Sequence, residues 1–279
     1  MKKISRRSFL AAAGLSVAAL ALTACGGSSS SVASSVASSA ASSEAASTSA
    51  VAGELTTVEA GKLTMATNAT FPPYEMTTDA GEFEGIDIET AQAIADKLGL
   101  ELQIDDMDFD AALLSVQQGK ADIVMAGVTV TDERKAVMDF SDSYATGIQS
   151  IIVPEGSDIA SPDDLAGKKI GTQRGTTGYI YSSDDFGDDA VVAYDNGLTA
   201  VQALNNGQVD AVVIDNAPAK EYVAANPGLA ILDTSYAEED YAIGMAKGSS
   251  LEAAVNAALE ELKADGTLQS IVDKYITAE

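Results

Sequence analysis

Residues 119–134, with the sequence GKADIVMAGVTVTDER, decide the fold of this chain. The stretch predicts a buried strand, a short loop and the start of a helix, with Thr131 as the N-cap and acidic residues in the first turn. Arg134 lies in that same turn, where the positive end of the helix dipole disfavours a cation. Two interpretations are open. Arg134 is either a surface residue offset by its acidic neighbours, or a fixed guanidinium that holds a carboxylate beside free backbone N–H groups.

The chain contains a second copy of this pattern. Residues 109–127 predict a helix that ends at Gly119, then Asp122 and an apolar strand; residues 198–215 repeat this order around Gly207 and Asp210. Two earlier segments, 63–67 and 168–172, also correspond as strands that lead into polar loops. Strands that alternate with helices in two copies predict two α/β lobes.

The carboxyl ends of the equivalent strands define the candidate site, because ligands of open α/β sheets bind there. The repeat makes Asp215 the position equivalent to Gly127, so the two residues leave the ends of equivalent strands. Thr129 and Arg134 follow Gly127 in the sequence. If the two lobes face each other, a cation and an anion meet across one cleft, which suits a zwitterion. The alternative is that Asp215 serves as a turn or cap residue before Pro218.

The start of the chain predicts export. Residues 1–24 combine a basic beginning with a short apolar stretch, which is typical of a signal peptide and too short to span a membrane. Residues 5–10, SRRSFL, also resemble a twin-arginine signal. The ending Leu-Thr-Ala-Cys at Cys25 resembles a bacterial lipoprotein box, which implies cleavage before Cys25 and attachment of lipid such as palmitate to its sulfur. The alternative is an ordinary signal peptide with an incidental cysteine.

Residues 25–53 are almost entirely small and polar, so we expect a flexible, lipid-anchored linker. The folded part is then exported and tethered to the outer face of the cell membrane, or to its periplasmic side.

Composition excludes several functions. The chain has 42 acidic and 16 basic residues and a net charge of −26, which disfavours nucleic acid as a partner. It contains no histidine and one cysteine, Cys25, so a zinc site, a Cys-His or Ser-His pair and an internal disulfide are excluded. We expect no catalytic residue, no metal and no cofactor.

Several motifs of residues 61–279 are similar, in the same order, to those of the extracellular solute-binding proteins, family 3, of polar amino-acid ABC transporters. They are TNATFPPYE at 67–75, GIDIE at 85–89, GVTVTDER at 127–134, DFSDSY at 139–144, DLAGKK at 164–169 followed by GTT at 175–177, and GQVDA at 207–211.

This resemblance implies a two-lobed α/β fold, the periplasmic-binding-protein fold of type II. Each lobe has an open mixed sheet with flanking helices, and two hinge crossings join the lobes. Lobe 1 is expected to contain residues 54–146 and 241–279, and lobe 2 residues 147–240. The tail, 251–275, should form two helices broken at Gly266 and packed on lobe 1.

The resemblance also implies the roles of the site residues. Asp215 takes the ligand's α-ammonium group. Phe71 and Phe109 form aromatic walls around its side chain, with plain core packing as the alternative. The α-carboxylate is held by Arg134, assisted by Gly127, Thr129, Thr176 and Thr177.

Two amides, Asn68 and Gln173, occupy positions that face the ligand's side chain in this family. Neutral amides suit a polar uncharged ligand such as glutamine or cystine, although Asn68 also suits a cap of the following turn. If Arg174 pointed inward, an acidic ligand would become possible.

The expected partners are a free amino acid, the permease and ATPase of an ABC transporter, and the membrane through the lipid anchor. The chain is expected to act as a monomer without catalysis, and its closed form should be what the transporter recognises. The alternatives are a dehydratase-like enzyme that uses Glu75 or Asp215 as acid or base, and a ligand sensor domain.

Overall fold

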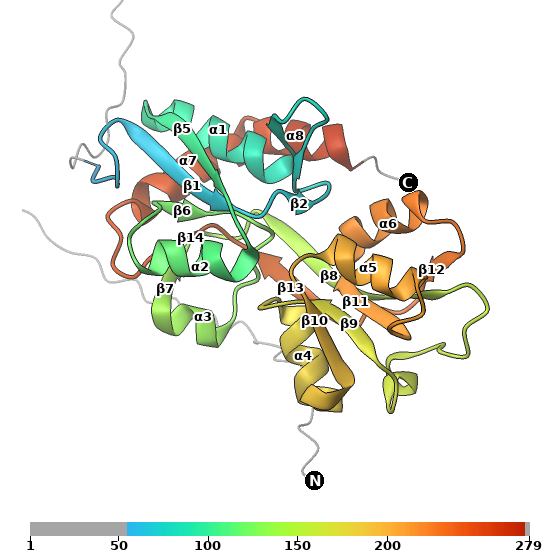
Figure 1. Ribbon diagram of the computed structural model, residues 1–279. Helices are drawn as coiled ribbons and strands as arrows, with labels where there is room; N and C mark the ends of the chain where they lie inside the picture. Colours follow the sequence, from blue (N-terminus) through green and yellow to red (C-terminus); the bar gives the residue numbers. More distant parts are fainter. Residues whose placement is uncertain (1–54, 277–279) are drawn as a thin grey trace, which may run out of the picture. The chain divides into compact units, whose positions relative to one another are not determined.

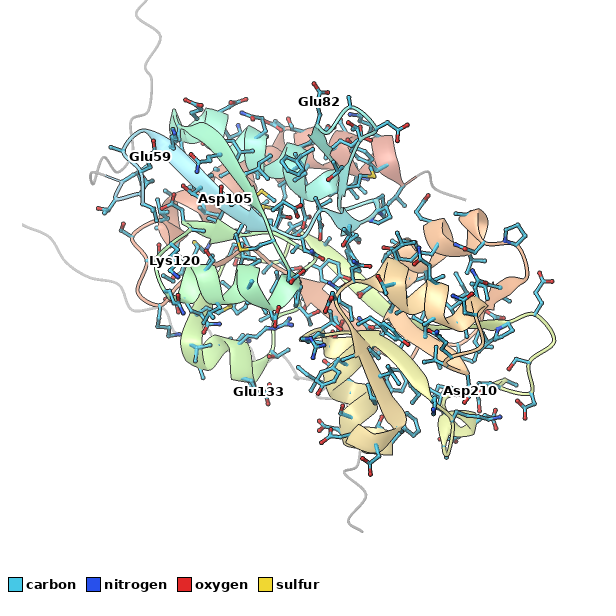
Figure 2. All side chains as sticks on the ribbon, viewed as in Figure 1. Glu59, Glu82, Asp105, Lys120, Glu133 and Asp210 are labelled. Carbon is cyan, nitrogen blue, oxygen red and sulfur yellow. The ribbon has the colours of Figure 1, made fainter. Side chains whose placement is uncertain are left out.

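The computed structural model describes residues 55–276 (Figure 1). The predicted signal peptide, the lipidation of Cys25 and the linker fall outside this part of the chain. Within it, no helix is both long enough and apolar enough to cross a membrane. Acidic side chains such as Glu59, Glu82 and Glu133 stand exposed at the surface (Figure 2).

The first sheet is mixed, with strand order β5-β1-β6-β14-β7. β1 runs parallel to β5 and β6, whereas β14 is antiparallel to β6 and β7. The strands are β1 (Lys62–Thr67), β5 (Glu101–Asp106), β6 (Ile123–Val124), β7 (Met138–Phe140) and β14 (Gly244–Ala246). Between β1 and α1 the chain forms a separate small sheet of β2 (Thr70–Phe71), β3 (Glu75–Thr77) and β4 (Phe83–Glu84).

Helices cover both faces of the first sheet because side chains of β1 alternate between them. Leu63 and Met65 belong to the core formed with α1, α7 and α8, whereas Ala66 belongs to the core formed with α2. The helices are α1 (Ile86–Leu98), α2 (Phe109–Gln117), α3 (Asp132–Val137), α7 (Glu252–Ala264) and α8 (Thr267–Tyr275). The tail therefore forms the two predicted helices, separated at Gly266, whose φ is 81°.

The second sheet is also mixed, with strand order β10-β9-β11-β8-β12 and with β13 paired to β8. Its strands are β8 (Ala145–Pro154), β9 (Ile170–Gln173), β10 (Val191–Tyr194), β11 (Ala211–Asp215), β12 (Leu229–Ile231) and β13 (Ala237–Tyr241). Its helices are α4 (Thr177–Phe186), α5 (Gly197–Asn205) and α6 (Asn216–Ala225), with 3₁₀ turns at Pro162–Leu165 and Asp188–Ala190.

The internal repeat has a structural cause. Asp122 accepts a hydrogen bond from the backbone N–H of Thr64 at 2.8 Å, and Asp210 accepts one from the N–H of Lys169 at 2.7 Å. In each copy the aspartate therefore ties the turn after a helix to a strand of its sheet, to Thr64 within β1 in the first copy and to Lys169 just before β9 in the second.

The chain passes from one sheet to the other twice, between β7 and β8 and between β13 and β14. The two passages lie side by side: β8 and β13 pair antiparallel, and the N–H of Tyr144 donates to the carbonyl of Tyr241 at 3.0 Å. These paired strands connect the two sheets in Figure 1.

Candidate functional site

One cavity gathers all ten side-chain and backbone positions singled out from the sequence, together with Glu75 and Ala126. It holds about 310 Å³ of empty space, part of which opens to solvent. The sequence-predicted residues that line it are Asn68, Phe71, Phe109, Gly127, Thr129, Arg134, Gln173, Thr176, Thr177 and Asp215.

These residues meet because they follow the carboxyl ends of strands in both sheets. Asn68 comes directly after β1 and Gly127 shortly after β6, while Gln173 and Asp215 are the last residues of β9 and β11. The cavity therefore lies where α/β sheets place their ligands.

Arg134 is buried, with 8% of its surface exposed, so the surface interpretation of this residue is wrong. Thr131 caps the helix as predicted, because its hydroxyl accepts the N–H of Arg134 at 3.1 Å. The guanidinium donates to the carbonyl of Thr129 at 2.7 Å and to that of Gly175 at 3.1 Å, and it lies 5.4 Å from the centre of the Phe109 ring. Burial lowers the pKa of Arg134, and the charge of Glu239 opposes this.

Asp215 is 7% exposed and occupies the N-cap position of α6, but its side chain makes no cap hydrogen bond. Instead it accepts hydrogen bonds from the Tyr241 hydroxyl and, at 2.8 Å, from the Gln149 amide. Burial raises the pKa of Asp215 to about 7; the charge of Glu239 adds to this rise, and the two hydrogen bonds oppose it. The two hydrogen bonds thus orient the carboxyl group, and its pKa of about 7 lets it gain or lose a proton close to neutral pH.

Glu239 is a buried carboxylate that the sequence analysis missed. Its Oε2 accepts hydrogen bonds from the hydroxyls of Thr129 at 3.1 Å and Thr177 at 3.0 Å, and from the Gln149 amide at 3.0 Å. It therefore joins a loop of the first sheet, a helix of the second and the connecting strand β8. The alternation of β13 was an available signal, because Glu239 shares a face with the fully buried Tyr241.

A second pair of buried carboxyl groups, Glu75 and Asp87, supports the loop at Gly127. Asp87 accepts the N–H of Gly127 at 2.9 Å and the hydroxyl of Tyr144 at 2.7 Å. Burial raises the pKa of Asp87 to about 6, and hydrogen bonds from Gly127, Tyr144 and Glu75 oppose the rise.

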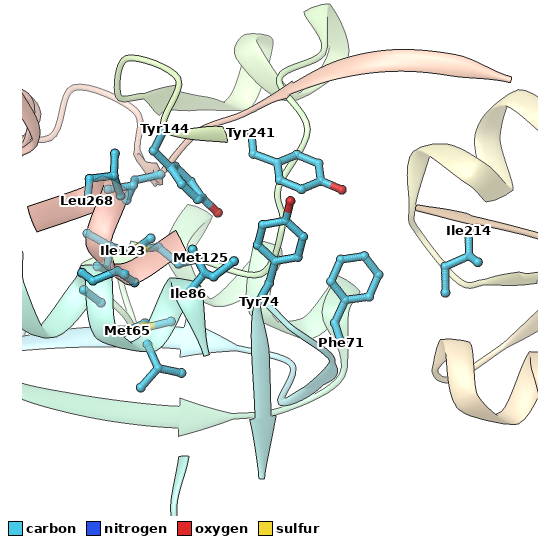
Figure 3. Packing of buried hydrophobic residues seen from close by; sticks show 14 of the residues in the cluster. Met65, Phe71, Tyr74, Ile86, Ile123, Met125, Tyr144, Ile214, Tyr241 and Leu268 are labelled. Carbon is cyan, nitrogen blue, oxygen red and sulfur yellow. The ribbon is translucent and has the colours of Figure 1, made fainter. Parts of the chain in front are cut away.

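The aromatic wall continues behind the cavity. Phe71 is 7% exposed and its ring lies 6.0 Å from that of Tyr74, which meets Tyr241 edge-on at 5.2 Å (Figure 3). Gly127 is required beside this wall, because its φ is +54° and a Cβ there would approach the Phe71 ring to 2.9 Å.

The two amides form a contact with each other, and Arg174 stays apart from them. Gln173 donates to Asn68 at 2.9 Å, and Asn68 also contacts the turn that follows it, where the Thr70 hydroxyl donates to its oxygen at 3.0 Å. Arg174 does not line the cavity; it is exposed and lies 3.9 Å from Asp195. The condition for an acidic ligand, an inward Arg174, is therefore not met.

No group of three or more Cys, Asp or Glu residues within 55–276 is arranged to hold a metal ion. The arrangement offers instead one cation, several buried acceptors and aromatic walls around one partly open cavity. Such a site can bind a small polar molecule through both of its charges.

Comparison with known proteins identifies similar chains. Residues 63–278 match the model of bacterial extracellular solute-binding proteins, family 3. A probable histidine-binding protein of Neisseria gonorrhoeae is 34% identical over 96% of this chain and 95% of its own length. The ABC transporter glutamine-binding protein GlnH of Bacillus subtilis is 34% identical over 71% of this chain and 74% of its own length. A structure of an ancestral arginine-binding protein bound to glutamine is 43% identical, with a TM-score of 0.75 over 78% of this chain and 99% of that one.

Proposed function

Because this chain belongs to the bacterial extracellular solute-binding proteins, family 3, we propose that it binds one free L-amino acid and delivers it to the permease and ATPase of an ABC importer. The observation that carries the proposal is that Arg134 and Asp215 line the same cavity from different sheets. A free amino acid needs both of its charges paired when it leaves water. A guanidinium and a carboxylate provide that pairing through charge-assisted hydrogen bonds.

We assign the α-carboxylate to Arg134, with Gly127, Thr129, Thr176 and Thr177 as further donors, and the α-ammonium to Asp215. Three arrangements support this assignment. Arg134 is fixed by two carbonyls and a ring, Asp215 is oriented by two donors, and α4 begins at Thr177 beside the cavity. A helix N-terminus favours an anion.

The ligand's side chain would lie between Phe71 and Phe109 and reach toward the amides of Asn68 and Gln173. These amides carry no charge, so we propose a polar uncharged ligand such as glutamine or cystine. The ancestral relative bound to glutamine supports the amide-bearing choice.

The ligand would be captured by closure of two lobes, 54–146 with 241–279 and 147–240, about the paired passages at β8 and β13. For the rest of the chain we propose a signal peptide at 1–24, lipid on Cys25 and a linker at 25–53, which would tether a monomeric binding protein outside the cell.

A thermal-shift screen of residues 54–279, the fragment that contains every described element, tests the function. The ligands are the twenty common amino acids, cystine, ornithine and citrulline. A true ligand at a thousandfold excess over its dissociation constant should stabilise the protein by about 4 kcal/mol. A screen in which no amino acid raises the melting temperature would contradict the proposal.

A further inference from the structure

A hydrogen bond outside the cavity connects elements that belong to different sheets. The hydroxyl of Tyr222 donates to the backbone carbonyl of Thr70 at 2.5 Å. Tyr222 belongs to α6 of the second sheet, whereas Thr70 is the first residue of β2, in the segment between β1 and α1. In Figure 1 this segment lies on the side of the first sheet that faces α5 and α6. Neither residue lines the cavity, so the contact is separate from the proposed ligand contacts.

Tyr222 is held in place by the packing of its helix. α6 buries Pro218, Ala219 and Tyr222, whose spacing puts them on one face of the helix. Gly197, the first residue of α5, leaves room for the ring, because a Cβ there would lie only 3.3 Å from it. Tyr222 is 6% exposed, and burial raises the pKa of its hydroxyl, so the hydroxyl remains a donor at neutral pH.

Other hydrogen bonds between the two sheets use groups that the ligand is proposed to meet. Arg134 donates to the carbonyl of Gly175 at 3.1 Å. Gln173 donates to Asn68 at 2.9 Å. A bound amino acid would compete for these donors, because its carboxylate and side chain would lie in the cavity that they line. The contact outside the cavity faces no such competition and stays available when the ligand is present.

We propose that the Tyr222 hydroxyl is a latch that holds the ligand-bound protein closed through its bond to Thr70. This rests on the proposed amino-acid-binding function and on closure about the passages at β8 and β13. If the lobes part about these passages, the two groups separate and water replaces their bond. The latch therefore stabilises the closed form alone, whichever amino acid lies in the cavity.

A contact that acts on closure has a different effect from one that touches the ligand. Loss of the hydroxyl removes one buried hydrogen bond from the closed form, so affinity should fall about three- to tenfold. The factor should be the same for every amino acid, because each one selects the same closed form. The loss should lie in the dissociation rate, since the open form that first meets the ligand lacks the bond.

Isothermal titration calorimetry of the wild-type chain, Tyr222→Phe and Tyr236→Phe tests the latch, with L-glutamine, L-cystine, L-arginine and L-histidine as ligands. Tyr236 is the matched control, because it is also 6% exposed and its hydroxyl donates to Asp185 of α4, within the second lobe. The fitted stoichiometry measures the folded fraction of each variant, so a folding defect is not mistaken for weak binding. Release of radiolabelled ligand into excess unlabelled ligand gives the dissociation rate.

Tyr222→Phe should bind each ligand of the wild type about three- to tenfold more weakly and release it faster by a similar factor. Tyr236→Phe should match the wild type in both measurements. Equal affinities of Tyr222→Phe and the wild type, or a loss carried by slower association, would overturn the latch.

A change in the ratio of affinities between two ligands would also overturn it. The Thr70 hydroxyl donates to Asn68 at 3.0 Å, so a selective effect would mean that Tyr222 positions Asn68 and does not act on closure. A wild-type chain that binds no amino acid would refute the proposed function, and the latch with it. A wild type that binds and a Tyr222→Phe variant that binds equally well would refute the latch alone.

Discussion

The side-chain amide of Gln173 donates a hydrogen bond to the side-chain oxygen of Asn68 over 2.9 Å. Asn68 follows β1 of the first sheet and Gln173 is the last residue of β9 in the second, so this bond joins the two sheets at the cavity. Asn68 is also held from behind, because its own amide donates to the carbonyl of Met107 at 2.8 Å. The contact carries no charge, which makes it a suitable place to alter ligand preference.

Asn68→Asp should shift preference toward cationic ligands. The new carboxylate keeps an acceptor for Gln173 and adds a negative charge at the cavity. A hydrogen bond to a charged group contributes about 1.5–3 kcal/mol, so the affinity of arginine relative to glutamine should rise about tenfold or more. Calorimetry with both ligands measures this, with the exposed Asn206→Asp as control. A ratio equal to that of wild type would show that Asn68 does not face the ligand's side chain.

Arg134→Ala should remove most of the affinity for any amino acid. Loss of one partner from a buried, hydrogen-bonded charge pair costs about 2–5 kcal/mol. Arg174→Ala is the matched control, because Arg174 is exposed and lies beside Asp195 rather than at the cavity. Equal affinities for the two variants in a direct titration would rule out the assigned carboxylate site.

Ligand affinity should fall as the pH drops below about 7. Burial raises the pKa of Asp215 to about 7, and only its ionised form pairs with an α-ammonium group. Below that pH the proton competes with the ligand, and affinity should fall up to about tenfold per pH unit. Titrations between pH 5 and pH 8 measure the slope, and a flat profile would exclude Asp215 as the ammonium partner.

Tyr241→Phe should shift the midpoint of this pH dependence to higher pH. The Tyr241 hydroxyl donates to Asp215 and thereby lowers the pKa of that carboxyl group. Without the hydroxyl the proton should compete at higher pH, so affinity at neutral pH should decrease and recover at alkaline pH. Tyr236→Phe, which removes a hydroxyl from Asp185 instead, should leave the midpoint unchanged.

Asp215→Asn should stabilise the empty protein while it abolishes binding. The folded pKa of Asp215 lies above its ordinary 3.8, so its contribution to stability is present at low pH and lost as pH rises toward about 7. One pKa unit corresponds to 1.36 kcal/mol, so the ionised Asp215 lowers the free energy of unfolding by on the order of 4 kcal/mol at pH 8. Thermal unfolding at pH 8 should show a higher midpoint for the variant, and a lower midpoint would contradict this account.

Local chemistry made much of the fold predictable. The cap of Thr131 on the helix of Arg134 depends on neighbours within three residues, as does the break between the tail helices at Gly266. The repeat predicted which strand ends correspond, and the cavity contains the residues named from those ends.

Residues whose structural roles could not be predicted act through partners that lie elsewhere in the sequence. Glu239 is held by hydrogen bonds from Thr129, Thr177 and Gln149. The nearest of these partners in the sequence, Thr177, is 62 residues away. Glu75 was named only as the acid or base of an alternative enzyme and is buried near the charge of Asp87, and the exposed Arg174 lies 3.9 Å from Asp195. The surroundings of these side chains are set by tertiary contacts, which a local sequence pattern does not reveal.

The paired passages between the sheets have a consequence for modularity. The chain leaves the first sheet and returns to it at points one hydrogen bond apart, from Tyr144 to Tyr241. Everything between them, including Gln173, Thr177 and Asp215, is therefore a continuous insertion with adjacent ends. Such a segment can be exchanged with that of a relative as a single cassette, so four of the twelve residues that line the cavity can change in one recombination event while the first sheet and its helices stay intact.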